Sequence, residues 1–160
     1  MPLVSLEDFS AISFEPAARF LGCDVGEKTI GLALSDTRKI IATPLSVIKR
    51  TQWKVDAVTL LKEIDSYKVG GVIVGFPLNM NGTEGPRCQA TRQFVSNLLK
   101  IKDIPMSLWD ERLSTSAVMR TLLEADVSRA KRKPLVDKMA ASYILQGFLD
   151  AFGRQVNKMK

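Results

Sequence analysis

Three apolar or β-branched stretches near the start of the chain predict β-strands. They cover residues 19–25 (RFLGCDV), 29–35 (TIGLALS) and 40–48 (IIATPLSVI), and only GEK and DTRK separate them. Such short connections are typical of hairpins, in which neighbouring strands run antiparallel. The pattern therefore predicts three antiparallel strands.

The middle of the chain alternates between helical spacing and short apolar runs. Residues 53–68 predict a helix that ends near Gly70, and residues 87–101 predict a second helix. Their apolar faces are predicted at Val58, Leu61 and Ile64, and at Ala90, Phe94, Leu98 and Ile101. Residues 69–77 (VGGVIVGFP) predict a strand buried on both faces, and residues 104–111 (IPMSLWDE) predict another strand.

The last third of the chain predicts two helices with a break between them. Ser114 is a suitable N-cap for a helix through Ala125. Residues 126–133 (DVSRAKRK) carry charge and little apolar surface, which predicts a loop. Pro134 suits the first turn of a last helix. The buried stripe of that helix is predicted at Val136, Met139 or Ala140, Tyr143 or Ile144, Gly147 or Phe148, and Ala151.

The resulting order, β-β-β-α-β-α-β-α-α, predicts an α/β protein. Strands joined by helical crossovers run parallel, so the sheet should be five-stranded and mixed, with about four flanking helices. This is the layout of the RNase H-like fold. We expect one such nuclease domain over residues 19–153, a loosely packed N-terminal extension over residues 1–18 and a C-terminal tail over residues 154–160.

Acidic residues follow two of the predicted strands. Asp24 ends the first strand, Gly75 the fourth and Glu111 the fifth, and the ends of parallel strands meet at one edge of the sheet. With the fourth strand between the other two, the backbones of Asp24 and Glu111 should lie about 10 Å apart. Gly75 has no side chain, so we expect space there for a metal ion or a phosphate. Asp110 stays an alternative to the longer Glu111.

Asp137 is the third candidate acid, because it lies in the predicted first turn of the last helix. Carboxylates alone suit Mg²⁺ or Mn²⁺, and two such ions can promote phosphodiester hydrolysis. Each acid also has a structural interpretation. Asp24 could be a turn residue before Gly26, Glu111 could pair with Arg112 or a lysine, and Asp137 could complement the helix dipole.

Composition narrows the chemistry. The 160 residues contain no histidine, which excludes enzymes with a histidine base and zinc sites with histidine ligands. A net charge of +6 favours a polyanionic partner, although a basic surface without such a partner would have the same net charge. The two cysteines, Cys23 and Cys88, form no metal-binding pattern. No apolar run is long enough to span a membrane, and acids occur early in the chain, so we expect a cytoplasmic protein.

A basic cluster precedes Asp137. It consists of Arg129, Lys131, Arg132 and Lys133, which could clamp a phosphate backbone or simply keep the predicted loop solvated. Arg112, Arg87 and Arg92 could contact phosphates or form ion pairs. Gly82 and Gly85 could admit a closely approaching backbone or form a plain turn. Trp109 and Phe76 could stack on bases, but aromatic residues at strand ends more often belong to the core.

Four motifs resemble those of the YqgF family. They are GCDVGEKTIGLALSD, VGFPLNMNGTEGP, DERLST and VDKMAASYILQGFLD, and they extend from Gly22 to Asp150. The resemblance implies an RNase H-like nuclease that matures the 5′ end of pre-16S rRNA and is related to Holliday junction resolvases. It also implies the acids Asp24, Glu111 and Asp137, a divalent metal and a cytoplasmic role in ribosome biogenesis. Thr29 stands where many members have a basic residue, so a phosphate contact could be missing or could be supplied by Lys28.

Other functions fit parts of the same sequence. DxGxxxxG also resembles the phosphate loop of actin-like and sugar-kinase ATPases, which need two such domains. A resolvase cutting four-way DNA junctions would use the same metal chemistry, and a non-catalytic module could bind rRNA through the basic cluster. The expected partner is nucleic acid, foremost pre-16S rRNA or a precursor ribosomal particle, bound by a monomer or homodimer without a membrane.

Overall fold

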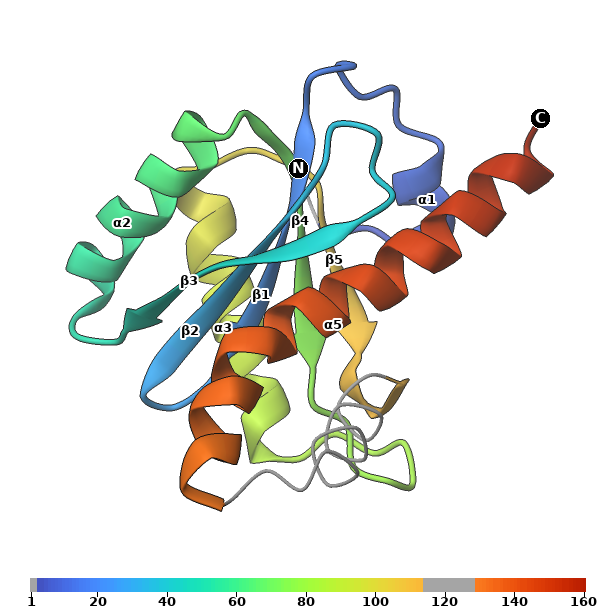
Figure 1. The fold of residues 1–160 in the computed structure, drawn as a ribbon. Coiled ribbons are helices and arrows are strands. Elements are labelled where there is room, and N and C mark those ends of the chain that lie inside the picture. Colours follow the sequence, from blue (N-terminus) through green and yellow to red (C-terminus); the bar gives the residue numbers. More distant parts are fainter. Residues whose placement is uncertain (1–2, 114–128) are drawn as a thin grey trace.

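The computed structural model describes residues 3–113 and 129–160, with side chains for residues 3–112 and 139–160. A five-stranded sheet with the order β3-β2-β1-β4-β5 forms its centre (Figure 1). The strands are β1 Arg19–Val25, β2 Thr29–Ser35, β3 Ala42–Lys49, β4 Val69–Phe76 and β5 Met106–Asp110. β1, β2 and β3 pair antiparallel, whereas β4 pairs parallel with β1 and with β5. The predicted mixed sheet, with the fourth strand between the first and the fifth, is confirmed.

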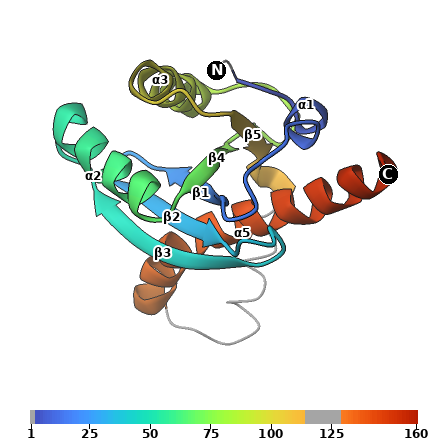
Figure 2. The ribbon, with the colours of Figure 1, turned by 90° about the horizontal axis from the view of Figure 1, so that it is seen from above.

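Helices cover both faces of this sheet (Figures 1 and 2). They are α1 Leu6–Ser10, α2 Trp53–Ser66, α3 Pro86–Ile101 and α5 Arg129–Lys158, with the short 3₁₀ helix η1 at Glu111–Leu113. α2 and α3 share one hydrophobic core with the sheet, and α1 and α5 share another on the opposite face. Burial on both faces explains why β4 is almost uniformly apolar.

The alternation of side chains along β1 assigns its residues to these two cores. Leu21 and Cys23 belong to the core under α2 and α3. Phe20 belongs to the core under α5, and the Gly22 backbone packs against Leu145 and Ala141 of that helix. Because side chains of a strand alternate between faces, Asp24, two residues after Gly22, projects to the same α5 face.

The N-terminal residues are integrated into the core, so the prediction of loose packing was wrong. Phe9 of α1 is completely buried and contacts Phe20 and Phe148, with ring centroids 5.1 and 5.2 Å apart. Farther towards the N-terminus, the Val4 amide donates to the Met106 carbonyl at 2.9 Å, which attaches the chain to β5. Burial of an aromatic side chain such as Phe9 contributes about 1.5–3 kcal/mol, which favours ordering of this segment.

The apolar face of α2 also differs from the prediction. Ala57, Leu60 and Ile64 are buried, whereas Val58 is 62% exposed. The helix ends at Ser66, and Lys68 enters β4 with a positive φ of 53°. Several apolar residues lie at helical spacing in this segment, and packing against the sheet selects the stripe through Leu60 and Ile64.

The last helix begins earlier and ends later than predicted. α5 starts at Arg129, so the basic cluster is helical rather than part of a loop, and Pro134 lies inside the helix. Alanine, arginine and lysine favour helices, which accounts for the early start. α5 continues to Lys158 through much of the expected tail, and Ala140, Ile144, Phe148 and Ala151 are buried as predicted. Residues 126–128 and the helix predicted from Ser114 to Ala125 lie outside the described residues.

Candidate active site

Two carboxyl groups meet at the carboxyl edge of the sheet. Asp24 lies near the end of β1, and Glu111 is the first residue after β5. The Glu111 side chain covers Gly75 of the intervening strand, since a Cβ at Gly75 would lie 2.6 Å from Glu111 Oε1. A side-chain hydrogen bond joins Glu111 to Asp24. We call Asp24 and Glu111 the acid pair.

The prediction of open space above Gly75 was therefore wrong. The same Cβ would also lie 2.6 Å from Ile144 Cδ1 of α5, so two side chains already fill this volume. The missing side chain of Gly75 instead allows Glu111 to reach Asp24 across a whole strand.

The acid pair is electrostatically unusual. Burial, the charge of Asp24 and the hydrogen bond to Asp24 raise the pKa of Glu111 from 4.5 to about 7. Asp110 adds to this increase in pKa, and Arg87 opposes it. Around neutral pH, a substantial fraction of the Glu111 carboxyl groups is therefore protonated. Burial and the Asp24 charge also raise the pKa of Cys23 to about 12, so that thiol stays neutral and is a poor nucleophile.

Asp110 has a different partner. Its carboxylate accepts hydrogen bonds from Arg112 Nη2 at 2.6 Å, from Nε at 3.0 Å and from the Arg112 backbone amide at 3.0 Å. These bonds to Arg112 hold the pKa of Asp110 below its usual value. The turn from β5 into η1 thus directs Asp110 to Arg112 and Glu111 to Asp24.

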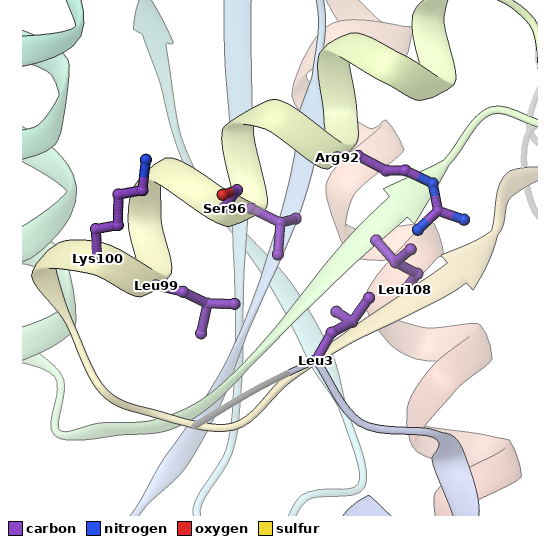
Figure 3. A pocket seen from close by; sticks show the side chains of 7 residues that line it. Leu3, Arg92, Ser96, Leu99, Lys100 and Leu108 are labelled. Atoms are coloured by element: carbon purple, nitrogen blue, oxygen red, sulfur yellow. The ribbon is translucent and has the colours of Figure 1, made fainter.

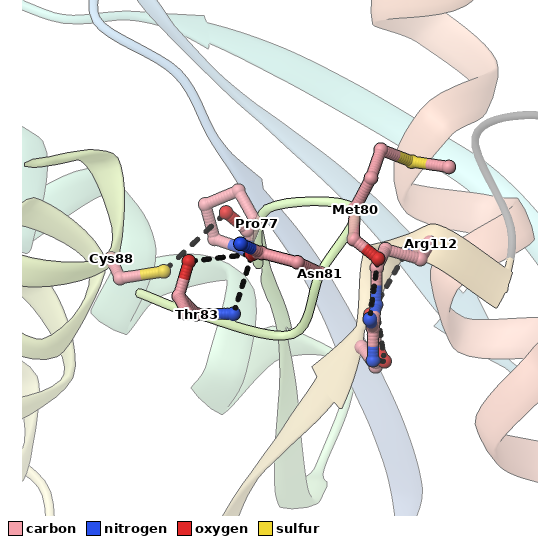
Figure 4. A network of polar contacts seen from close by, with 7 residues as sticks. Pro77, Met80, Asn81, Thr83, Cys88 and Arg112 are labelled. Atoms are coloured by element: carbon pink, nitrogen blue, oxygen red, sulfur yellow. Dashed lines mark hydrogen bonds and ion pairs between the residues drawn. The ribbon is translucent and has the colours of Figure 1, made fainter. Parts of the chain in front are cut away.

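Arg112 also anchors the loop after β4. Its Nη1 donates to the Met80 carbonyl at 3.3 Å (Figure 4). Within this loop, Asn81 accepts from the Thr83 hydroxyl at 2.6 Å, and Gly82 adopts a φ of +85°, so the glycine serves the turn itself. Of the two interpretations of Arg112, the structure supports the ion pair.

A cavity of about 460 Å³ lies between this loop, the start of α3 and η1. Its lining consists of Pro77, Leu78, Asn79, Met80, Gly85, Pro86, Arg87, Glu111 and Arg112. Glu111 therefore borders a volume that can hold part of a substrate, and Arg87 supplies positive charge to it.

The remaining candidate residues are described to different extents: Lys28 with its side chain, and those of α5 by their backbones alone. Lys28 is exposed in the β1–β2 turn, a few residues after Asp24. Arg129, Lys131, Arg132, Lys133 and Asp137 belong to α5 by their backbones, and their side chains lie outside the described residues. Since α5 begins at Arg129, the placement of Asp137 in the first turn of that helix was wrong. Among the side chains that are described, no three His, Cys, Asp or Glu residues form a metal-binding group.

The two aromatic candidates pack against the hydrophobic core, with Phe76 buried and Trp109 partly buried. Trp109 packs edge-on against Phe148, with ring centroids 6.0 Å apart, and its indole touches Gly147. Phe76 is 6% exposed, and the Arg92 guanidinium lies 4.8 Å from its ring centroid. Both observations support the core interpretation over base stacking.

A second large cavity, of about 440 Å³, lies between α3 and β5 (Figure 3). It is lined by Leu3, Arg92, Val95, Ser96, Leu99, Lys100 and Leu108. No carboxylate belongs to this lining, so the acid pair and its neighbouring cavity are the better candidate for a hydrolytic site.

One arginine near the acid pair was missed by the sequence analysis. Arg50 follows β3, and its Nη1 donates to the Gly26 carbonyl at 2.7 Å in the β1–β2 turn. Nothing in the local sequence signals this contact, because it depends on the pairing of β2 with β3.

None of the described helices is long and apolar enough to cross a membrane.

The fold is that of RuvC-type resolvases. Thermus thermophilus RuvC, solved in complex with a Holliday junction substrate, matches with a TM-score of 0.52 at 13% identity, covering 85% of this chain and 96% of that chain. The yeast mitochondrial Holliday junction resolvase Ydc2 matches with a TM-score of 0.50 at 11% identity, covering 96% and 86%. The predicted RNase H-like fold is confirmed.

The sequence identifies the family. Residues 18–151 match the RuvX family, described as Holliday junction resolvase. A relative from Paramagnetospirillum magneticum, named "Putative pre-16S rRNA nuclease", is 55% identical over 150 residues, covering 94% of this chain and 96% of the relative. A Rhodospirillum rubrum relative of the same name is 51% identical over 156 residues, covering 97% and 96%. The chain belongs to the RuvX family, which is the YqgF family that its motifs resemble.

Proposed function

We propose that this protein is a divalent-metal-dependent nuclease that hydrolyses phosphodiester bonds with Asp24 and Glu111 in its active site. The observation that carries the proposal is the contact between these two carboxyl groups across Gly75. Two half-buried acids in contact are unfavourable for stability, since partial burial and mutual repulsion disfavour their ionised forms. Such an arrangement is typical of functional sites.

The acid pair fits a hard cation. Its donors are oxygen atoms only, and cation binding would favour loss of the proton from Glu111. Asp24 and Glu111 would hold Mg²⁺ or Mn²⁺, which supplies Lewis acidity and an activated water when bound. Asp137 is the proposed third acid. It precedes Ile144 by about two helical turns, and Ile144 lies against Gly75.

The basic residues near this edge would bind the phosphate backbone. Arg87 borders the same cavity as Glu111. Lys28, Arg129, Lys131, Arg132 and Lys133 are proposed as further contacts, which the net charge of +6 supports. Arg112 instead positions the loop after β4 through Asp110 and the Met80 carbonyl.

For the substrate, we propose a precursor of 16S rRNA, because relatives about half identical to this chain carry that function in their name. The role would then be 5′-end processing of pre-16S rRNA in the cytoplasm, during ribosome biogenesis. A four-way DNA junction is the second candidate, supported by the family description.

A cleavage panel tests both substrates. Purified protein is incubated with Mn²⁺ or Mg²⁺ and with labelled precursor rRNA ends, single-stranded RNA, single-stranded DNA and a four-way junction. We expect metal-dependent cutting by wild type and by Asp65→Asn, a control at an exposed carboxylate on α2. Asp24→Asn and Glu111→Gln should not cut. Equal cutting by all proteins would contradict the assigned site. Binding without cutting by the wild-type protein would favour a non-catalytic module.

A further inference from the structure

A small cavity lies beside the acid pair, at the turn between β1 and β2. Its volume is about 160 Å³, and three separate parts of the chain line it. These are the turn itself, the residue after β3 and the start of α3. The lining residues are Val25, Gly26, Glu27, Arg50, Pro86, Arg87 and Ala90. We call this volume the arginine cavity.

The two arginines are held in place by the backbone that follows Asp24. Arg50 Nη1 donates to the Gly26 carbonyl at 2.7 Å, and Arg87 Nη2 donates to the Val25 carbonyl at 3.5 Å. Each guanidinium has five N–H donors, so these bonds orient the group and use only part of its capacity. A planar guanidinium with remaining donors matches the geometry of a phosphate group.

The charge of the arginine cavity also suits an anion. Its lining contains two guanidinium groups and one carboxylate, that of Glu27, so its formal charge is positive. Arg87 and Pro86 are shared with the larger cavity that contains Glu111. The two cavities are therefore adjacent along the same edge of the sheet.

We propose that Arg50 and Arg87 bind a backbone phosphate of the nucleic acid, next to the phosphate that is cut at the acid pair. This inference rests on the proposed nuclease function for the nature of the ligand. Val25 and Asp24 are consecutive in β1 and project to opposite faces of the sheet. A nucleic-acid strand that reaches both the arginine cavity and the acid pair would therefore cross the carboxyl edge of the sheet. Arg50 is a positioning residue, because it contacts the strand away from the reacting bond.

The test measures binding rather than cutting. Fluorescein-labelled single-stranded RNA, and single-stranded DNA in parallel, is titrated with Asp24→Asn protein in EDTA at several salt concentrations. Removing one phosphate contact reduces the slope of log K against log salt by about 0.7. We expect that reduction for Arg50→Gln, and tighter binding for Glu27→Gln. Lys49→Gln is the matched control, because Lys49 is the exposed neighbour of Arg50 and lines neither adjacent cavity.

A purely structural role for Arg50 predicts a different pattern. Arg50→Lys keeps the positive charge but loses the planar set of guanidinium donors. If Arg50 contacts a phosphate, this variant should retain most of the salt slope. If Arg50 only holds the β1–β2 turn through the Gly26 carbonyl, Arg50→Lys should behave like Arg50→Gln. Thermal unfolding of each variant verifies folding. The proposal is overturned if Arg50→Gln and Lys49→Gln change the slope equally, if Arg50→Lys fails as Arg50→Gln does, or if Glu27→Gln leaves binding unchanged.

Cleavage by the wild-type protein is scored separately. Metal-dependent cutting combined with Arg50-independent binding would overturn only the phosphate site at the arginine cavity. Arg50-dependent binding without any cutting would overturn only the nuclease proposal. Failure to bind either nucleic acid would overturn both, and a slope change with RNA alone would identify the preferred strand.

Discussion

The carboxyl group of Glu111 is hydrogen-bonded to Asp24, although β1 and β5 are separated by a whole strand. The contact needs a long side chain on one partner and no side chain on the residue between them. Gly75 meets the second requirement, and its neighbours Glu111 and Ile144 occupy the volume that a side chain would need.

A methyl group at Gly75 should therefore disrupt the acid pair. Gly75→Ala would place a carbon 2.6 Å from both Glu111 Oε1 and Ile144 Cδ1. We expect loss of cleavage and a decrease of about 1–3 kcal/mol in the free energy of unfolding, measured by urea denaturation. Gly153→Ala is the control, because nothing lies within 4 Å of that position in α5. It should be neutral or stabilising by about 0.5–1 kcal/mol. Equal effects of the two substitutions would contradict the role of Gly75.

Glu111 should make the stability of the metal-free protein depend on pH. Its pKa is raised from 4.5 to about 7 in the folded state, so on raising the pH the unfolded chain loses this proton first and stability falls between these values. Well above pH 7 the penalty is complete and of the order of 3 kcal/mol, because each pKa unit corresponds to about 1.4 kcal/mol. Glu111→Gln removes it.

Urea denaturation in EDTA measures this effect. Glu111→Gln should be more stable than wild type near pH 8, and the difference should vanish near pH 4, where the glutamate is protonated in both states. A constant difference across this range would show that Glu111 titrates normally in the folded protein.

Divalent cations should reverse this penalty. A cation that binds only the folded state stabilises it by about 2.7 kcal/mol at 100 times its dissociation constant. We expect Mn²⁺ or Mg²⁺ to raise the Tm of wild type near pH 8, and EDTA to remove the increase. Asp24→Asn should lose the response, and Asp65→Asn should keep it. An equal increase in all three proteins would indicate cation binding elsewhere.

Asp110 and Glu111 should differ sharply in their effects on activity, although they are adjacent in sequence. Asp110 pairs with Arg112, so Asp110→Asn loosens the loop after β4 and should reduce cleavage only moderately. Glu111→Gln should abolish cleavage, because it removes a carboxylate from the acid pair. The comparison is made by single-turnover cleavage of the preferred substrate. The opposite ranking would assign the site to Asp110.

The N-terminal segment should contribute to stability. Phe9 is completely buried against the rings of Phe20 and Phe148, so Phe9→Ala should cost about 3–5 kcal/mol in the free energy of unfolding. Ile40→Ala is the control at a side chain that is 52% exposed, and it should have little effect. A small cost at Phe9 would restore the prediction of a loosely packed extension.

The sheet was predictable because its signals are local. Short turns join β1, β2 and β3, and the buried β4 follows a helix directly, so the strands and their antiparallel or parallel directions could be predicted. The strand order came from the RNase H-like layout. Helix faces were less certain, as Val58 shows. The start of α5 was missed because charged residues that favour helices also favour loops.

The site was predictable in its acids but not in their contacts. Asp24 and Glu111 could be placed at one edge from strand ends alone. The choice between Asp110 and Glu111 depends on the turn into η1, and the filling of the space at Gly75 depends on Ile144 from a distant helix. Arg50 could not be found, because its contact with Gly26 arises from strand pairing.

The most direct test of this account compares metal-dependent cleavage by wild type, Asp24→Asn, Glu111→Gln and Asp65→Asn on the same substrate panel. The account predicts that wild type and Asp65→Asn cut in Mn²⁺ or Mg²⁺, that EDTA stops both, and that the two variants of the acid pair bind without cutting. Cutting that survives either Asp24→Asn or Glu111→Gln, at the wild-type rate and with the wild-type metal requirement, would contradict it.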